Sequence, residues 1–409
     1  MDTITHGIAG ALVGKGFFSR RAAQVAVFAA TIGAMFPDID VVAQIFSRDP
    51  LSIVKYHRVV THSFFVLPVF AALLAWLTRA GVGFLKDRYS QFSHLESPSW
   101  PMLTLIYGIG IASHILLDGM TSFGTQMWYP LSRQRVAWDI LFIIDFCFTA
   151  LVLLPQIVGW IYSRRESAAR RAIILWLIFA LASVVVWKIA DAVGFPFHRW
   201  IAALASLIIA LLFFLPMYRG AGFRITTPAW CRAGTYLTVI YLIACGFAHH
   251  VALVKAQAYA TTNHLNVERI AALPLPPSFL DWGDVIRANN GVYQARFDLR
   301  STAAQPNFWF RADSPPDAFI SRALQLPEVQ TYWNFARFPI IRSFAEDGQH
   351  FVDFDENRFV TRRTHGPAPF SYRVIFDLEG NPVEEGWQAD GLDVRRMIKI
   401  LPARAGNPR

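Results

Sequence analysis

Long apolar runs separated by short polar connections most constrain what this 409-residue chain can fold into. A helix that crosses ~30 Å of hydrocarbon needs ~20 mostly apolar residues. Seven stretches reach or approach that length, at 22–45, 59–79, 101–118, 136–161, 172–193, 199–217 and 233–254. An eighth, at 4–17, is short and rich in Gly and Ala, which favours close helix packing. We therefore expect an all-α polytopic membrane bundle of about eight transmembrane helices.

The composition agrees with a membrane protein and divides the chain in two. Only 16% of the residues are charged, whereas soluble domains have roughly 25%. Residues 1–255 hold 21 Lys and Arg against 11 Asp and Glu, and residues 256–409 hold 17 against 18. We expect a transmembrane helical domain at 1–255, a Pro-rich joint at 256–278 and a small α+β domain at 279–409. The basic residues punctuate apolar runs and form no stripe, so no nucleic-acid partner is expected.

The distribution of Lys and Arg among the connections predicts the orientation. With eight crossings, the connections at 15–21, 79–99, 162–171 and 218–232 carry 13 of these residues. Those at 46–58, 119–135 and 188–199 carry seven. Short cytoplasmic loops are the more positive ones, so we expect the N-terminus and the α+β domain to lie outside the cytoplasm. The N-terminus lacks the basic start and cleavage site of a secretory signal peptide, so we expect it to be retained.

Ionisable residues gather at the ends of the expected spans, where each is costly and needs a partner or a function. The set comprises His6, Asp38, Asp40, His57, His62, His114, Asp118 and Asp139. With the orientation above, all of them lie at the outer ends of their spans. His114 and Asp118 are spaced i and i+4, so on a helix both face one side and can hold one metal ion.

The other pairs constrain the site less tightly. Asp38 and Asp40 flank one residue after a proline, where non-helical backbone can point both carboxylates into one pocket. His57 and His62 would share a site only if His57 lies in the loop before the helix and His62 in its first turn. Taken alone, a His at a span end is more often an interfacial residue, and Asp139 suits the N-terminal acid of a helix. The joint placement favours a metal site.

Imidazole and carboxylate ligands without thiolate suit zinc, with manganese or iron as alternatives. The ligands suffice for one to three ions, and sites with several metals are typical of phosphoester hydrolysis. A cluster at the level of the lipid headgroups points to a lipid or lipid-linked phosphate as the substrate class.

Four motifs carry a resemblance to a known family. MDTITHGIAGALVG, FPDID, HRVVTHS and SHILLDGMTSFGTQMWYP, in that order, resemble the motifs of the YdjM-type (LexA-regulated) family of bacterial inner-membrane metal-dependent hydrolases. The resemblance covers roughly residues 1–145. It implies a metal site formed by His6, Asp38, Asp40, His57, His62, His114 and Asp118, and a location in the bacterial inner membrane.

We therefore expect a membrane-bound hydrolase that uses water activated by a metal. The expected catalytic residues are Asp40, His62 and Asp139, and the expected substrate-binding residues are Arg58, Ser63 and Ser122. Arg58 suits a phosphate oxygen, although it equally suits an interfacial cation, and hydroxyls at helix starts are usually caps. The alternative is a metal-binding transporter or a non-enzymatic membrane scaffold. A transporter, however, would be expected to place acids at mid-membrane in its deeper spans.

Overall fold

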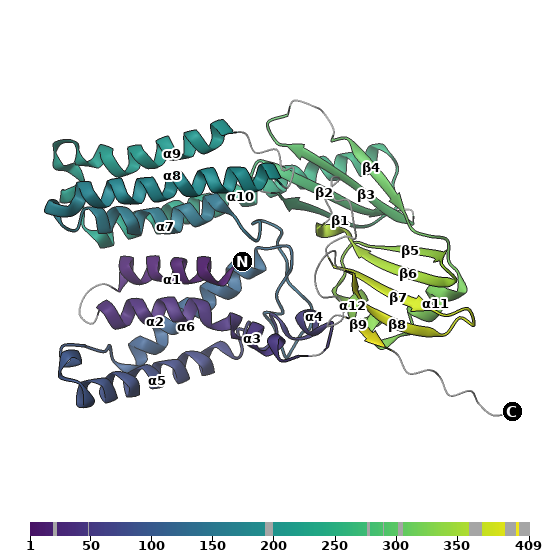
Figure 1. The fold of residues 1–409 in the computed structure, drawn as a ribbon, viewed down its shortest axis with the longest axis horizontal. Coiled ribbons are helices and arrows are strands. Elements are labelled where there is room, and N and C mark those ends of the chain that lie inside the picture. Colours follow the sequence, from purple (N-terminus) through teal and green to yellow (C-terminus); the bar gives the residue numbers. More distant parts are fainter. Residues whose placement is uncertain are drawn as a thin grey trace.

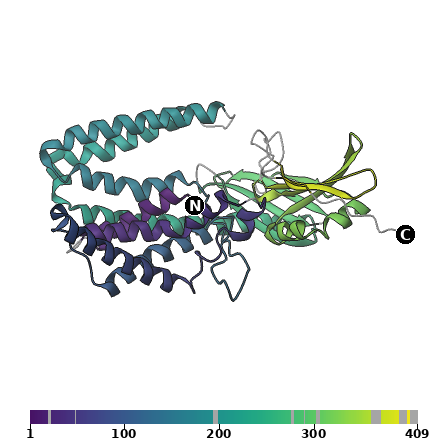
Figure 2. The same ribbon diagram turned by 60° about the horizontal axis from the view of Figure 1, so that its bottom comes forward.

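A helical bundle forms one end of the molecule and two β-sheets form the other (Figures 1 and 2). The computed structural model describes residues 1–18, 23–47, 49–192, 199–275, 279–288, 290–301, 306–359, 370–388 and 398–400. Within these residues, six helices are long and apolar enough to cross a membrane: Ala23–Val42, Leu67–Arg88, Trp100–Gly119, Arg165–Lys188, Arg199–Arg224 and Thr227–Thr262. Two shorter helices, α1 (Thr3–Phe17) and α7 (Phe146–Ile161), occupy the remaining expected stretches.

Apolar side chains cover the outside of the bundle, as a helix in lipid requires. In α8 (Ala168–Ala192), Leu181 and Ile178 are exposed, and in α9 (Arg199–Phe214), Leu207 and Ile208 are exposed. Exposed apolar faces of this extent are typical of a membrane interaction surface.

Glycines let α2 (Ala23–Met35) pack closely between α1 and α6 (Trp100–Gly119). A Cβ atom at Gly10 would overlap the carbonyl oxygen of Ala30, and one at Gly110 would lie 2.9 Å from that same oxygen. The expected close packing of the first helix through small residues is therefore present. It draws together the start of α1 and the ends of α2 and α6.

Two helices begin later than the sequence indicates. The stretch at 59–79 becomes α5 (Leu67–Arg88), with a proline in its first turn, and turns follow α4 (Ser52–Tyr56) up to that point. The stretch at 136–161 becomes α7, which begins where Asp145 accepts a hydrogen bond from Phe148 N at 2.7 Å as the N-cap. His57, His62 and Asp139 therefore lie in loops rather than in helices.

The last helix of the bundle, α10 (Thr227–Thr262), extends well past the expected span at 233–254. Its 36 residues reach about 54 Å at 1.5 Å per residue. Ala252 packs with Trp282, and Ala256 packs with Ile286, so the helix supports the first sheet. The residues expected as a joint, 256–278, contain the end of α10 and strand β1; residues 276–278 lie outside the described part of the chain.

Two antiparallel sheets, with their strands in chain order, follow α10. The first contains β1 (Val267–Pro274), β2 (Asp281–Ala288), β3 (Gly291–Asp298) and β4 (Phe308–Ala312). The second contains β5 (Pro339–Glu346), β6 (Gln349–Glu356), β7 (Ser371–Phe376), β8 (Pro382–Gln388) and β9 (Ile398–Ile400). With α11 (Ala318–Ala323) and α12 (Pro327–Phe335), the sheets form what we call the β-domain.

The β-domain rests directly on loops of the helical bundle. Its core, which includes Tyr332 and Phe354, also contains Leu51 and Val54, at the start of α4 and within it, and Phe123 from the loop after α6. In addition, the Lys55 ammonium pairs with the Glu328 carboxylate at 2.6 Å. The β-domain therefore lies at the end of the bundle where α1, α2 and α6 converge (Figure 1).

Candidate metal centre

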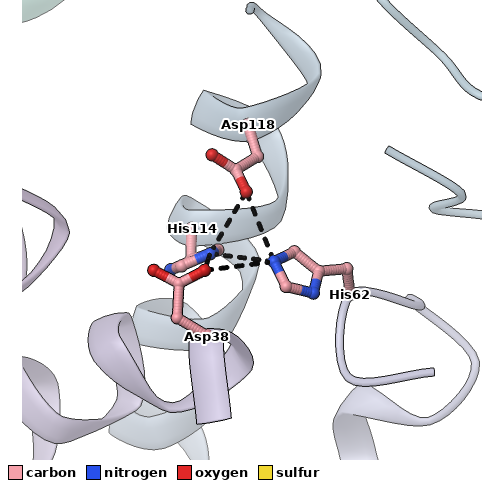
Figure 3. Close-up of side chains that lie close together, drawn as sticks. All are labelled: Asp38, His62, His114 and Asp118. Atoms are coloured by element: carbon pink, nitrogen blue, oxygen red, sulfur yellow. Dashed lines mark hydrogen bonds and ion pairs between the residues drawn. The ribbon is translucent and has the colours of Figure 1, made fainter. Parts of the chain in front are cut away.

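Four buried side chains converge at this end of the bundle (Figure 3). Asp38 comes from the 3₁₀ turn η1 (Phe36–Ile39), His62 from the turns before α5, and His114 and Asp118 from α6. Each offers one ligand atom, and these atoms lie within 4.8 Å of one another. His62, His114 and Asp118 have no exposed surface. The i, i+4 spacing on α6 places His114 and Asp118 on one face, as expected.

In both His62 and His114 the outward ring nitrogen, Nδ1, has a polar partner, so the inward nitrogen, Nε2, is the one that can bind a cation. His114 Nδ1 donates to the Ala34 carbonyl oxygen at 2.6 Å, so Nε2 is unprotonated in the neutral ring. His62 Nδ1 lies 3.0 Å from Thr61 Oγ1 and 3.4 Å from Asp40 Oδ2, which favours the same tautomer. The two Nε2 atoms then face each other at 3.1 Å. Lone pairs and carboxylates in this arrangement repel one another unless a positive charge lies between them, either a proton on His62 or a metal ion.

Five of the distances among these four side chains, at 3.1–3.6 Å, are close to those around a tetrahedral ion. Zinc bonds of ~2.0–2.1 Å give tetrahedral edges of about 3.3–3.4 Å. Asp118 Oδ2 lies 3.3 Å from the Nε2 atoms of both His62 and His114. Asp38 Oδ1 lies 3.3 Å from His114 Nε2 and 3.6 Å from His62 Nε2. The residues present therefore suit a divalent metal such as zinc.

A second ligand group shares one carboxylate with the first. Asp38, Asp40 and His57 also bring their ligand atoms within 4.8 Å of one another. His57 Nδ1 lies 2.9 Å from Asp40 Oδ1, and Thr61 Oγ1 donates to Asp40 Oδ2 at 3.1 Å. Because Asp38 belongs to both groups, it would be a ligand of both ions if each group held one.

Asp118 has three further partners, one at its ligand oxygen Oδ2 and two at Oδ1. Arg58 Nε lies 2.9 Å from Asp118 Oδ2, His6 Nε2 lies 3.1 Å from Oδ1, and the amino nitrogen of Met1 contacts Oδ1 as well. The His6 ring stacks on the His114 ring with centroids 3.7 Å apart. His6 Nδ1 is buried without a hydrogen-bond partner among the described residues, so one polar atom beside the centre still has an unused lone pair or proton.

Electrostatics at His62 favour a positive charge. Burial alone would lower the pKa of His62, but the carboxylates of Asp118, Asp38 and Asp40 raise it to about 9. For His57, burial dominates over Asp40 and lowers the pKa. Groups that stabilise a proton at the His62 ring stabilise a metal cation in its place for the same Coulombic reason.

Arg58 lies against Asp118 rather than in open space. It is 2% exposed and adopts a left-handed backbone with φ of 61°, which costs a non-glycine residue about 1 kcal/mol or more. Its guanidinium donates to Thr121 Oγ1 at 2.9 Å and to the Asp118 carbonyl oxygen at 3.4 Å. The structure therefore supports Arg58 as a residue that orients Asp118.

The remaining expected site residues have other partners. The Ser63 hydroxyl contacts the Tyr129 carbonyl oxygen and accepts from Phe65 N at 3.1 Å. Asp139 forms two hydrogen bonds of 2.8 Å with Arg337 of the β-domain, and the carbonyl oxygen of Ser122 accepts from Arg358 at 2.8 Å. The structure brings together His6, Asp38, Asp40, His57, Arg58, His62, His114 and Asp118, and gives Ser63, Ser122 and Asp139 contacts elsewhere.

Three threonines that the sequence did not single out support the ligands. Thr3 donates to Asp38 Oδ2 at 2.5 Å, Thr61 donates to Asp40, and Thr121 accepts from Arg58. Each lies within three residues of a ligand or its neighbour in the same motif. Such hydroxyls fix ligand orientation, and their proximity to the ligands in sequence is the signal that could have found them.

Comparison with known proteins identifies a related family. Residues 1–193 match the model of the YdjM inner membrane protein family, so the resemblance indicated by the four motifs is confirmed. The match ends just after α8 and leaves α9, α10 and the β-domain outside it. No curated protein and no solved structure matches the chain.

Proposed function

We propose that the chain, whose residues 1–193 match the model of the YdjM inner membrane protein family, is a membrane-bound metal-dependent hydrolase of a phosphoester in a lipid or lipid-linked substrate. The observation that carries this proposal is the tetrahedral spacing of Asp38, His62, His114 and Asp118, with Asp38 shared by a second group. The donor set suits zinc best, with manganese or iron as alternatives.

The two ligand groups suit different tasks. The side chains of His62, His114 and Asp118 have no exposed surface, so the first group holds its ion away from solvent. In the second group the side chains of His57 and Asp40 are 14% and 11% exposed, so substrate and water would arrive there. Bound ions would supply the Lewis acidity that activates water and offsets phosphoryl charge.

Asp40 is the best candidate for the general base. It is the most accessible of the three clustered carboxylates, and His57, Thr61 and the Arg58 amide fix its two oxygens. We assign His62 to holding the ion, because it is fully buried and its Nδ1 side is occupied by Thr61 and Asp40. Asp139, engaged by Arg337, acts through position rather than by contact with substrate.

Apolar side chains beside the more open group support a lipid substrate. Ile39, Val42, Tyr56 and Val60 are 53%, 51%, 59% and 45% exposed. Ile39 lies between Asp38 and Asp40, and Tyr56 precedes His57. An apolar surface adjoining polar ligands fits a molecule with a hydrocarbon chain and a polar head.

Positive charge near the centre supports an anionic headgroup. The guanidinium carbons of Arg58 and Arg135 lie 5.1 and 5.2 Å from the centre of the Phe123 ring. Burial, together with neighbouring Arg58 and Arg358, lowers the pKa of Arg135. Both guanidinium groups are engaged by protein groups, Arg58 by Asp118 and Arg135 by backbone carbonyl oxygens, so they favour a phosphate through their electric field rather than by direct contact.

The test is hydrolysis by purified protein of a phosphatidic acid and of a polyprenyl phosphate, with and without chelator. We expect turnover that chelator abolishes and zinc restores. His114→Ala should be inactive, whereas His94→Ala, at an exposed loop position, should behave like the parent. Turnover that is unchanged by the chelator, or an active His114→Ala variant, would refute the proposal.

The burial of the first group also supports a second candidate, a non-enzymatic scaffold with a structural ion. Closed sites with four protein ligands are typical of structural zinc. In that case metal removal would destabilise the protein, and none of the lipid substrates would be turned over at any metal content. A transporter, the remaining alternative, would move the ion into sealed vesicles.

A further inference from the structure

The loop that follows Asp118 is bonded directly to the end of α6. Trp138 N donates to the Gly119 carbonyl oxygen at 2.8 Å, and Ile140 N donates to the Met120 carbonyl oxygen at 2.9 Å. Asp139 lies between these two bonds in a left-handed conformation with φ of 54°. A residue in that region persists only where its surroundings hold it.

The β-domain supplies the group that holds Asp139. Arg337 Nη1 and Nη2 each donate to one oxygen of its carboxylate at 2.8 Å. The Asp139 side chain is 5% exposed and that of Arg337 is 24% exposed. A paired fork of this kind fixes the orientation of both groups, and its loss would leave a nearly buried charge unpaired.

A second arginine holds the same loop from the same anchor. The buried carboxylate of Glu356 accepts from the backbone amides of Arg337 and Arg358, at 2.5 and 2.9 Å. The Arg358 guanidinium in turn donates to the Ser122 carbonyl oxygen at 2.8 Å. Both arginines that reach the loop are therefore fixed by one acid of the β-domain.

Phe123 connects the β-domain to the second ligand group. On one side its ring lies 5.3 Å from that of Phe335 and 6.0 Å from that of Phe370. On the other side it lies 5.7 Å from the His57 ring and 5.1 Å from the Arg58 guanidinium. The packing of the β-domain therefore limits where His57 and Arg58 can move.

We infer that the β-domain acts as a clamp, by which we mean that its contacts hold the metal ligands in place. Within the clamp, Arg337 is a positioning residue for these ligands. The clamp fixes the end of α6, which carries Asp118, through Asp139, and it fixes His57 through Phe123. This inference rests on the proposed metal centre. It assigns a role to a part of the chain that lies outside the residues matched by the family.

Cobalt binding provides the test, because the visible absorption of Co²⁺ reports the geometry of its ligands independently of any turnover. Arg337→Ala should bind Co²⁺ about 10-fold more weakly, the lower end of the effect of outer-sphere partners, with an altered absorption band. Asp139→Ala should show the same loss, and the double variant should lose no more than either single variant, because one interaction is removed in each case.

Arg342→Ala is the matched control, since Arg342 pairs with Asp353 and Asp355 inside the β-domain. It should retain the affinity and spectrum of the parent. If Arg337→Ala does not fold, the Co²⁺ affinity and absorption are measured on Arg337→Lys instead, and the same loss of affinity is expected. Parental affinity and spectrum in the Arg337 variant would overturn the clamp alone. Absence of Co²⁺ binding in the parent would overturn the metal centre and the clamp together.

Discussion

Asp38 is the side chain whose removal distinguishes a shared two-ion centre from a single site. It belongs to both ligand groups, whereas His114 belongs only to the first and His57 only to the second. Asp38→Ala should therefore lower the affinity for both ions. His57→Ala should lower the affinity for the ion of the second group only, because the four-ligand group remains intact.

The magnitude follows from the number of ligands. A four-ligand structural zinc site contributes about 10–16 kcal/mol of binding free energy, so one ligand accounts for roughly 3 kcal/mol, or about 100-fold in affinity. In the first group Asp38 is one ligand of four, and a loss of that size is expected. In the second it is one of three, and the remaining pair should not retain the ion through dialysis.

The assay is elemental analysis of the purified protein after zinc loading and dialysis, followed by competition with a chelator of known affinity. The parent should retain two ions, His57→Ala one, and Asp38→Ala none or one bound about 100-fold more weakly. Asp87→Ala, at an exposed acid in α5, is the control and should match the parent. One ion retained with parental affinity in both Asp38→Ala and His57→Ala, or two ions retained in Asp38→Ala, would refute a shared carboxylate.

Three further outcomes are expected. Gly10→Val should destabilise the bundle by about 1–3 kcal/mol, because its side chain would overlap the Ala30 carbonyl oxygen. Gly81→Val, inside α5 with open space around it, should not be destabilised. Thermal unfolding in detergent compares the two variants, and equal melting temperatures would contradict the packing. Asp284→Asn should become more stable than the parent as the pH rises above about 4, by about 1.4 kcal/mol per unit of pKa shift. The reason is that burial raises the pKa of Asp284, so the folded parent keeps a proton that its unfolded state releases; a pH-independent difference in unfolding free energy would contradict this. A cysteine at exposed Leu378, in a variant without the native cysteines, should react with a membrane-impermeant thiol reagent in intact cells with a permeabilised outer membrane; labelling only after lysis would place the β-domain in the cytoplasm.

Local patterns in the sequence predicted the parts of the site that depend on local geometry. The i, i+4 pair His114 and Asp118 is on one face of α6 because helix periodicity requires it. The small residues of the first helix predicted close packing, and Gly10 meets the Ala30 backbone. Each apolar stretch contains a helix, because a helix satisfies its backbone hydrogen bonds within one segment in lipid.

Boundaries and long-range partners were beyond local patterns. Apolar residues such as Val59 and Val60 extend the apolar stretch in sequence, yet the helix begins at Leu67, next to a proline that suits a first turn. Asp139 looked like a helix acid, but its partner Arg337 lies 198 residues away and no spacing rule connects them. From the sequence, Arg58 suits either a phosphate oxygen or an interfacial cation, and no local pattern indicates its buried partner Asp118, 60 positions along the chain.

X-ray absorption at the zinc edge of the loaded protein tests the metal centre most directly. We expect a first shell of nitrogen and oxygen ligands at about 2.0–2.2 Å, with imidazole scattering and no sulfur. His114→Ala should lose part of the imidazole signal. A sulfur shell, or an imidazole signal unchanged in that variant, would contradict it.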